Sequence, residues 1–411
     1  MIPFADCVCK SILLYVPSVL QVYKPLKLTY NDFRVSAPAY GPGYGPPLVR
    51  ILQCPKTKGD TGMVDFNIGI IGAGHIAGVI AETIAKLDGF KIGAIASKDQ
   101  ARADEFAAKY GIEKAYGHYA DLLADPDIEL VYIATVHAAH PFIAIEALKA
   151  GKPVLIEKPL SYNAKTAQTV MAFARQQKLF CGEAMWTRYM PLTQHFRELI
   201  EKKVIGDICS ATATLGYKLT DKVRLLRPEL AGGALLDLGI YPLSMIFLAM
   251  GEFPLGAISS TVRLNSNVDA IDSIAMNFTR GRIATICTSM MHQLDNRAVF
   301  YGTRGRIEIE GTNLPTFVRV YGENGEILEE TMPPENQISG YEYEFLAARN
   351  AIIMEKVEPA EITHTETLRT LQFMDQMRAQ WKISFPLPEE PKPEGPAGEG
   401  KEPPKNGAPQ S

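Results

Sequence analysis

The stretch Phe66–Ala77, FNIGIIGAGHIA, decides the fold of this chain. Its first half, residues 66–71, is a mostly apolar run typical of a strand that helices cover on both faces. Its second half has the spacing G-x-G-x-x-A, made by Gly72, Gly74 and Ala77. A helix is predicted to follow directly. A strand, a glycine turn and a helix in this order predict a dinucleotide-binding domain.

Each position of this turn has a physical role in that prediction. The first glycine makes the tight turn, the second lets the backbone approach a pyrophosphate, and the alanine lets the helix pack on the strand. The amide groups at the start of the helix predicted over residues 75–87 bind phosphate oxygens. A glycine turn with a purely structural role is the alternative. The predicted cofactor contacts in the turn are Gly72, Gly74, His75, Ile76 and Ala77.

The end of the second predicted strand, residues 91–96, bears on the choice of cofactor. Ser97 and Lys98 follow it, and Arg102 lies in the first turn of the next helix. An acid at this place accepts hydrogen bonds from the ribose of NAD, whereas a hydroxyl and cations hold the 2'-phosphate of NADP. These three residues therefore favour NADP over NAD as cofactor. In the alternative, Asp99 is the ribose-binding acid, displaced by two residues.

Polar side chains follow the next buried strand, predicted over residues 130–134. Thr135, His137 and His140 are expected at the carboxyl edge of the sheet, beside the glycine turn. Two histidines three residues apart are compatible with a metal, but no third ligand has a suitable spacing. We therefore predict contact with cofactor or substrate and no metal, with a capping or packing role as the alternative for each histidine.

An apolar strand at residues 154–156 ends in Glu157 and Lys158, within the run PVLIEKPL. A lysine at the carboxyl end of a strand in an open α/β sheet is a candidate for chemistry. The alternative is a solvated turn. Glu157 has two open roles: it keeps Lys158 charged, or it contacts the ribose of the nicotinamide.

Aromatic and cationic residues stand together where the chain leaves this domain. The segment Glu183–Tyr189, EAMWTRY, follows a strand predicted over residues 179–182. Such a segment suits a polar, ring-shaped substrate, so Trp186 and Arg188 are predicted substrate contacts. Interdomain packing is the alternative.

The second half of the chain has a different pattern. Short runs with two-residue alternation and tight turns between them indicate an antiparallel sheet. The predicted strands are residues 208–215, 257–264, 271–278, 283–289, 298–302, 306–310 and 316–321. Closing helices are predicted over residues 341–354 and 363–380. The predicted fold is α/β: a Rossmann domain over residues 63–182, then an α+β domain over residues 183–385 with a large open, mainly antiparallel sheet.

An apolar helix through Met250 is predicted to begin within Ala231–Pro242, AGGALLDLGIYP. Asp237 and Tyr241 are four residues apart, so a helix would place a carboxylate and a phenol on one face. A buried acid on so apolar a helix is costly without a partner. The pair is therefore a candidate for function.

Composition narrows the functional class. The chain has 411 residues, 46% of them hydrophobic and 21% charged, which is ordinary for a globular protein. A formal net charge of -4, with no dense basic run, argues against a nucleic-acid partner. No apolar span approaches the roughly 18 to 20 residues of a membrane helix, so no membrane partner is expected. The spacing of the six cysteines suits a reducing compartment and a cytoplasmic location.

The two ends of the chain differ from its middle. Residues 1–62 include the linker-like PAYGPGYGPP and are expected to be poorly ordered. We expect translation to start at Met63 and the upstream segment to be a gene-model artefact; native peptides from residues 1–62 would refute this. Residues 386–411 have almost no large apolar side chain, so a disordered tail is expected.

Together, GIIGAGHIA, GKPVLIEKPL and DLGIYPL, in this order and spacing, resemble the Gfo/Idh/MocA oxidoreductase family over roughly Val64–Phe385. TVHAAH, EAMWTRYMP and GGALLDLGIYP are most similar to the branch with trans-1,2-dihydrobenzene-1,2-diol dehydrogenase and NADP-dependent D-xylose dehydrogenase. The resemblance implies an NADP-dependent dehydrogenase of a sugar, polyol or dihydrodiol, and a homodimer. A reductase of a keto- or anhydrosugar and a redox-silent sensor that binds NADP and a sugar are the alternatives.

A hydride leaves carbon as the hydroxyl proton leaves, so the implied reaction requires a base at the oxygen. Free tyrosine has a pKa of about 10, and an adjacent ammonium lowers it. In the hypothesis Tyr241 takes the proton, Lys158 binds the reacting oxygen and lowers that pKa, and Asp237 orients substrate or lysine. Arg263 is a further candidate for the pocket wall that Trp186 and Arg188 shape.

Overall fold

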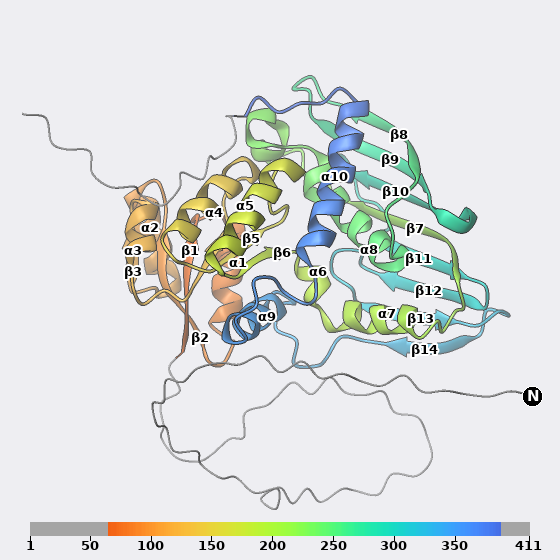
Figure 1. The fold of residues 1–411 in the computed structure, drawn as a ribbon, viewed down its shortest axis with the longest axis horizontal. Helices are drawn as coiled ribbons and strands as arrows, with labels where there is room; N and C mark the ends of the chain where they lie inside the picture. Colours follow the sequence, from red (N-terminus) through yellow and green to blue (C-terminus); the bar gives the residue numbers. More distant parts are fainter. Residues whose placement is uncertain (1–64, 388–411) are drawn as a thin grey trace, which may run out of the picture. The chain divides into compact units, whose positions relative to one another are not determined.

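The computed structural model describes residues 65–387, drawn in colour in Figure 1. The predicted N-terminal extension, residues 1–62, lies outside the described residues. So do residues 388–411, which make up nearly all of the predicted C-terminal tail.

The first domain is built on a six-stranded sheet in the order β3-β2-β1-β4-β5-β6, whose neighbouring strands pair in parallel. Its strands are β1 (Phe66–Ile71), β2 (Phe90–Ala96), β3 (Lys114–Tyr116), β4 (Leu130–Ile133), β5 (Val154–Glu157) and β6 (Cys181–Ala184). Its helices are α1 (His75–Ile84), α2 (Gln100–Tyr110), α3 (Tyr119–Ala124), α4 (His140–Lys149) and α5 (Ala164–Gln177). This is the predicted Rossmann arrangement, and it aligns the carboxyl ends of β1, β4 and β5.

Burial explains why these elements could be predicted from the sequence. Every residue of β4 and β5 is buried, because helices cover both faces of the sheet and apolar residues are required on each. Helix α5 begins where Asn163 accepts a hydrogen bond from the amide of Thr166 at 2.8 Å. The short β3 was not predicted, because three residues give no period.

The second domain contains an eight-stranded sheet in the order β14-β13-β12-β11-β7-β10-β9-β8. The strands are β7 (Ile208–Gly216), β8 (Gly256–Arg263), β9 (Asp269–Asn277), β10 (Ile283–Ser289), β11 (Arg297–Gly302), β12 (Gly305–Glu310), β13 (Phe317–Tyr321) and β14 (Ile327–Thr331). Strands β7 and β10 run parallel and the other neighbours antiparallel, so the prediction of a mainly antiparallel sheet is confirmed. The edge strand β14 was missed, because its apolar Ile327 and Leu328 are adjacent instead of alternating.

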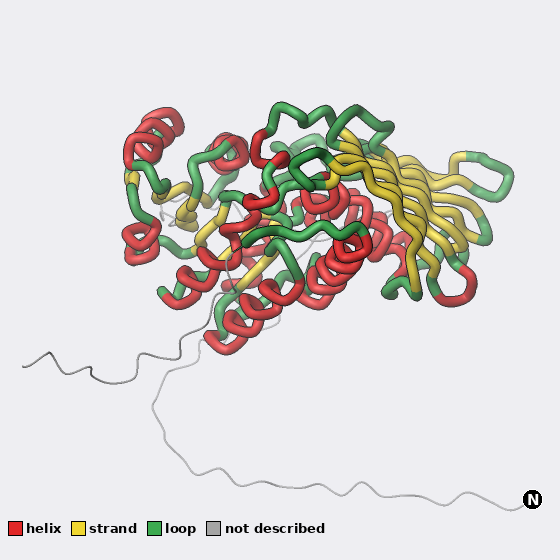
Figure 2. The backbone as a smooth tube through the Cα atoms, turned by 90° about the horizontal axis from the view of Figure 1, so that it is seen from above, coloured by secondary structure: helices red, strands yellow, loops and turns green. Residues whose placement is uncertain are grey.

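Helices cover one face of the large sheet, as Figure 2 shows. They include α6 (Trp186–Tyr189), α7 (Pro191–Glu201), α8 (Ile240–Met250) and α10 (His364–Gln380). One stretch, Pro228–Met250, is long and apolar enough to cross a membrane by composition alone, so the expectation that no span approaches that length is wrong. Its most apolar window is 89% buried inside the molecule, which is the behaviour of a core helix.

Helix α9 (Glu342–Ile353) returns from the second domain to the first. Phe345 packs on the ring of Tyr132 in β4, with 5.2 Å between the ring centres, and lies in one apolar cluster with Ile68 of β1. Tyr341, just before α9, is thereby brought to the edge of the first sheet.

Candidate active site

Lys158 lies at the centre of the site, directly after β5. Its Nζ donates to the backbone oxygen of Asp237 at 2.6 Å and to Oδ1 of the same residue at 3.2 Å. The ammonium also lies 4.8 Å from the centre of the Tyr241 ring. Its side chain is 12% exposed, so these contacts are largely shielded from water. The structure thus brings together, from two domains, the three residues predicted to be catalytic.

Asp237 connects several cationic and polar side chains. Besides Lys158, its Oδ1 accepts from Nη1 of Arg224 at 3.0 Å and lies 3.6 Å from Nε2 of His137. Burial by itself raises the pKa of Asp237, but the charges of Lys158 and Arg224 and the contact with His137 outweigh burial. The pKa of Asp237 is therefore held well below its ordinary value, and the group is a carboxylate.

The pKa of Tyr241, at the start of α8, differs from the expectation that Lys158 lowers it. Burial raises its pKa well above the ordinary value, and the nearby Tyr341, Glu157 and Asp237 raise it further. The expected lowering by Lys158 is not found, because the ammonium faces the ring and the hydroxyl oxygen has another partner. That partner is the indole Nε1 of Trp186, which donates to Oη at 3.0 Å and lowers the pKa of Tyr241.

Glu157 is buried at the end of β5. Its Oε1 accepts from the hydroxyl of Tyr132, and its Oε2 accepts from the backbone amide of Lys158 at 3.1 Å. Burial raises the pKa of Glu157, although both of these contacts oppose the rise. The carboxyl group is hydrogen-bonded to the backbone of Lys158 and not to its ammonium.

His140 has the packing role given above as the alternative. Its Nδ1 lies 2.9 Å from the carbonyl oxygen of Pro159, and its Nε2 lies 3.2 Å from that of Thr135. Burial lowers the pKa of His140 to about 3. The ring therefore joins the loops after β4 and β5, and its predicted contact with cofactor is not supported.

His137 connects the two domains. It begins η2 (His137–Ala139), and its Nδ1 lies 2.9 Å from the carbonyl oxygen of Ala231. Burial lowers its pKa. Both ring nitrogens face the second domain, since Nε2 faces Asp237. Among residues 65–387 no three His, Cys, Asp or Glu side chains gather as metal ligands.

The glycine turn fits a dinucleotide phosphate. Gly72 has a φ of 109°, and a Cβ there would lie 2.5 Å from the carbonyl oxygen of Ala134. Helix α1 begins at Gly74 without a side-chain cap, which leaves its first amides available to an anion. The buried Oγ1 of Thr135, beside this turn, has no hydrogen-bond partner within the described structure. His75 is exposed, Ile76 is partly buried, and Ala77 packs against the sheet as predicted.

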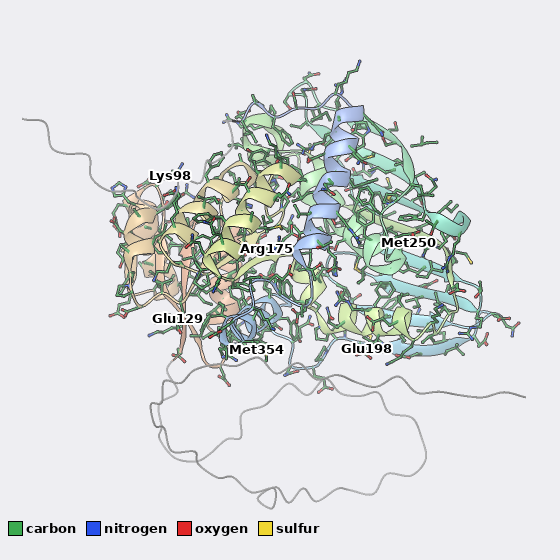
Figure 3. All side chains as sticks on the ribbon, in the orientation of Figure 1. Lys98, Glu129, Arg175, Glu198, Met250 and Met354 are labelled. Atoms are coloured by element: carbon green, nitrogen blue, oxygen red, sulfur yellow. The ribbon has the colours of Figure 1, made fainter. Side chains whose placement is uncertain are left out.

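The residues predicted to select NADP lie at the carboxyl end of β2. Arg102 donates from Nη2 to the carbonyl oxygen of Ala73 in the turn, at 3.1 Å. Ser97 is buried, whereas Lys98 is exposed at the top of the first domain in Figure 3. Asp99 caps α2 by accepting from the amide of Ala101 at 3.0 Å. Its carboxylate is thus already engaged, which weakens the alternative that it binds ribose.

Two arginines predicted to contact substrate lie elsewhere. The guanidinium of Arg188 is 2% exposed, and it pairs with Glu366 at 2.5 Å and with Ser244 at 3.3 Å. Arg263 ends the edge strand β8 and donates to Asn267 and to the carbonyl oxygen of Trp381. Both side chains thus have partners within the protein, and their contact with substrate stays a prediction. Sequence proximity to aromatic or strand residues does not show which way a long side chain turns.

Two residues of the site were missed. Arg224 reaches Asp237 from η3 (Val223–Leu226), a turn with no periodic signal. Tyr341 stacks on Trp186, with ring centres 4.0 Å apart and 9° between the planes. It is held there because the carboxylate of Glu342 accepts from the amides of residues 338–340. The sequence did not indicate Tyr341 as a site residue because it lies far from Trp186 along the chain.

Two family models match the chain. One, an oxidoreductase family with an NAD-binding Rossmann fold, matches residues 66–184, and the other, the GFO/IDH/MocA C-terminal domain, matches residues 193–308. Trans-1,2-dihydrobenzene-1,2-diol dehydrogenase of Xenopus tropicalis is 31% identical over 326 residues, covering 77% of this chain and 98% of that protein. The chain belongs to the Gfo/Idh/MocA oxidoreductase family. It is an NAD(P)-dependent oxidoreductase, as predicted.

Another relative and two solved structures are also similar to the chain. The enzyme of the same name from Mus musculus is 36% identical over 281 residues, covering 68% of this chain and 82% of that one. The structure of KijD10, a 3-ketoreductase from Actinomadura kijaniata with NADP and TDP-benzene, matches with a TM-score of 0.67 and 25% identity over 77% of this chain and 97% of that one. Aldose-aldose oxidoreductase of Caulobacter crescentus shares the fold, with a TM-score of 0.70 at 20% identity over 77% and 98% of the two chains.

Proposed function

We propose that this family member oxidises a ring hydroxyl or hemiacetal carbon of a small polyol, a D-xylose-like sugar or a trans-dihydrodiol, with NADP as cofactor. The observation that carries the proposal is the contact of Lys158 with both Asp237 and Tyr241 at the sheet edge that holds the glycine turn. The relatives named dihydrodiol dehydrogenases support the diol as substrate.

Several residues would hold the cofactor, which when bound supplies the hydride acceptor. The uncapped amides of α1 and the close approach at Gly72 suit a pyrophosphate. Ser97 and Arg102 suit a 2'-phosphate, and the carboxylate of Asp99 is used as the cap of α2. The similar structure of the 3-ketoreductase with NADP supports the same choice.

Tyr241 would exchange the hydroxyl proton with substrate. An indole N–H can only donate, so the phenol oxygen accepts from Trp186 and its own O–H points away from the indole. That direction leaves the O–H for a substrate oxygen. In the oxidation, Tyr241 first loses its own proton to solvent, and the same indole N–H stabilises the phenolate. The phenolate then takes the hydroxyl proton of the substrate.

Lys158 would bind the reacting oxygen. An ammonium has three N–H donors, and two acceptor atoms of Asp237 use two of them. The third can donate to substrate. In this scheme Asp237 orients Lys158, and Arg224 and Lys158 together keep Asp237 ionised.

The test is turnover with trans-dihydrobenzenediol and D-xylose, followed as NADPH absorbance at 340 nm. Lys158→Met should reduce kcat by about 100-fold or more, the scale of acid–base catalysis, with NADPH binding largely kept. A matched control is Lys152→Met, a partly buried lysine that binds only backbone oxygens of residues 125 and 128. Near-normal turnover of Lys158→Met refutes the proposed role.

The reverse reaction on a keto- or anhydrosugar is a second candidate, supported by the similarity to a 3-ketoreductase. Consumption of NADPH with a ketosugar, without oxidation of any diol, would favour it. Binding of NADPH and sugar without turnover in either direction would instead favour the redox-silent sensor.

We also propose a homodimer formed through the outer face of the large sheet and a cytoplasmic location. Exposed apolar side chains on that sheet, such as Ile258 at 82% and Ile283 at 55% exposure, support a covered face. Light scattering tests the dimer, and a monomer at micromolar concentration would contradict it. Cell fractionation tests the location.

A further inference from the structure

The segment that carries Asp237 has an unusual backbone. Residues Leu235–Gly239 form a π-helical turn, η5, ahead of α8. The sequence predicted an ordinary helix with Asp237 and Tyr241 on one face. In the structure the carbonyl oxygen of Asp237 is an acceptor for Lys158 at 2.6 Å. Single π-turns in helices often occur at functional sites, and this one presents the backbone oxygen and Oδ1 of Asp237 to the lysine.

The start of this turn rests on a buried carboxylate that the mechanism has not used. Oδ2 of Asp269, at the beginning of β9, accepts from the amide of Leu235 at 2.5 Å. Its Oδ1 faces Gly233, where φ is 110° and a Cβ would lie 2.3 Å from that oxygen. Asp269 is 1% exposed. Both of its oxygens therefore contact the segment that leads to Asp237.

A second buried acid holds Asp269 in place. The pairing of β8 with β9 shifts register between Val262 and Arg263, which lets the side chain of Asp269 reach that of Asp272. Asp272 is fully buried and accepts from Oγ1 of Thr261 at 2.7 Å, and its buried Oδ2 has no partner in the described structure. A proton on that oxygen would give Asp269 a hydrogen-bond donor. Two carboxyl groups in contact cannot both ionise readily, so the pair retains one proton.

Charge around the pair assigns that proton. Burial, and next the charge of Asp269, raises the pKa of Asp272 well above its ordinary value. Asp269 is the acceptor of the pair: it also binds the amide of Leu235, and Arg378 from α10 favours its ionised form. Cys287 of β10 is a further titratable group near Asp272. The unpartnered Oδ2 of Asp272 and the amide that Asp269 binds favour the proton on Asp272, with Asp269 as the carboxylate that faces the turn.

We propose that Asp269 is a positioning residue: through the amide of Leu235 it sets the π-turn that presents Asp237 to Lys158, and Asp272 holds Asp269 by a shared proton. This inference rests on the function proposed above, in which Lys158 binds the reacting oxygen. Misplacing a reacting group by about 1 Å costs on the order of 100-fold in rate.

The test compares variants of the full chain by kcat, KM, NADPH affinity from fluorescence, and Tm. Asp269→Ala should lose about 100-fold in kcat with NADPH affinity unchanged. Asp269→Asn should retain most turnover, because its amide oxygen still accepts from Leu235. Asp272→Asn should also retain it, because an amide N–H replaces the carboxylic O–H.

The matched control is Glu308→Ala. Glu308 is a buried acid of the same sheet, on β12, whose partners are Arg306 and Arg297. The variant Glu308→Ala should lower Tm as Asp269→Ala does, but it should leave kcat within about 2-fold because it affects only stability. If Asp269→Ala does not fold, Asp269→Glu is the alternative variant. It keeps the charge and the hydrogen-bond acceptor, but its side chain is one methylene longer and displaces the turn, so kcat should fall.

Hydrogen exchange of the peptide over residues 233–241 gives a readout that does not need activity. It should speed up in Asp269→Ala and not in Glu308→Ala. Unchanged exchange there, or unchanged kcat in Asp269→Ala and Asp269→Glu, would overturn the positioning role. If the unmodified enzyme turns over no sugar or diol in either direction, the proposed function fails, and exchange alone still decides this inference.

Discussion

Replacing Trp186 by phenylalanine would remove one hydrogen-bond donor from Tyr241, the proposed acid–base residue, and little else. The indole N–H that donates to Oη of Tyr241 at 3.0 Å is lost. A phenyl ring remains to stack on Tyr341, whose ring lies parallel to the indole at 4.0 Å. The pocket therefore keeps an aromatic wall.

The size of the effect follows from the charge on the acceptor. A hydrogen bond to a charged group is worth about 1.5–3 kcal/mol, and 1.36 kcal/mol corresponds to about one pKa unit. Tyr241 already has its pKa raised by burial, with the Trp186 hydrogen bond opposing the rise. Trp186→Phe should raise the pKa of Tyr241 further, by about one to two units. Oxidation at neutral pH should slow by about 10- to 100-fold.

The assay is the pH dependence of kcat for diol oxidation with saturating NADP. In the limb where the rate rises with pH, the variant's curve should move toward higher pH by the same one to two units. The rate should recover in part at high pH, because a stronger base is more reactive once it is deprotonated.

The chain contains a matched control in its second tryptophan. The chain has two tryptophans, and Trp381 donates its N–H to Oγ of Ser259 at 2.9 Å. Trp381→Phe makes the same chemical change on the second domain, away from Lys158, and should leave the pH profile in place. An unshifted profile in Trp186→Phe, or an equal shift in both variants, would refute the role given to the indole.

Three further changes test other parts of the site. Asp237 has a lowered pKa in the folded state, so its contribution to stability is present above the unfolded pKa of about 3.8 and is lost as pH falls below that value. Asp237→Asn should therefore make Tm fall less steeply at acid pH, and an unchanged slope of Tm against pH would argue against the ion pairs. Arg102→Ala with Ser97→Asp should weaken NADP relative to NAD by about tenfold or more in kcat/KM, as expected for losing one charged contact and adding a repulsive charge; equal ratios before and after would count against these residues. Gly72→Ala should abolish dinucleotide binding measured by NADPH fluorescence, because its Cβ would lie 2.5 Å from the carbonyl oxygen of Ala134 at a φ of 109°; retained affinity would contradict the close approach.

Much of the site could be predicted because its signals are local. The turn at Gly72 and the buried strand before Lys158 each lie within a dozen residues, and parallel strands bring their carboxyl ends to one edge. That rule correctly placed Lys158 at the same edge of the sheet as the glycine turn. It did not decide what His140 does, because a buried ring that joins two loops has the same sequence signature as a ligand contact.

The sequence by itself determined the longer strands and helices, the Rossmann topology and the identity of the glycine turn, but not the strands β3 and β14. Periodicity and turn residues report on neighbours in the chain, and these features depend on neighbours. Only the tertiary structure decided that Asp237, 79 residues after Lys158, would hold it through two oxygens, that Arg188 would turn inward to Glu366, and that Trp186 would be the donor to Tyr241. Those contacts depend on how the large sheet and α9 pack against the first domain. Packing also sets the burial that raises the pKa of Tyr241, which no spacing of residues expresses.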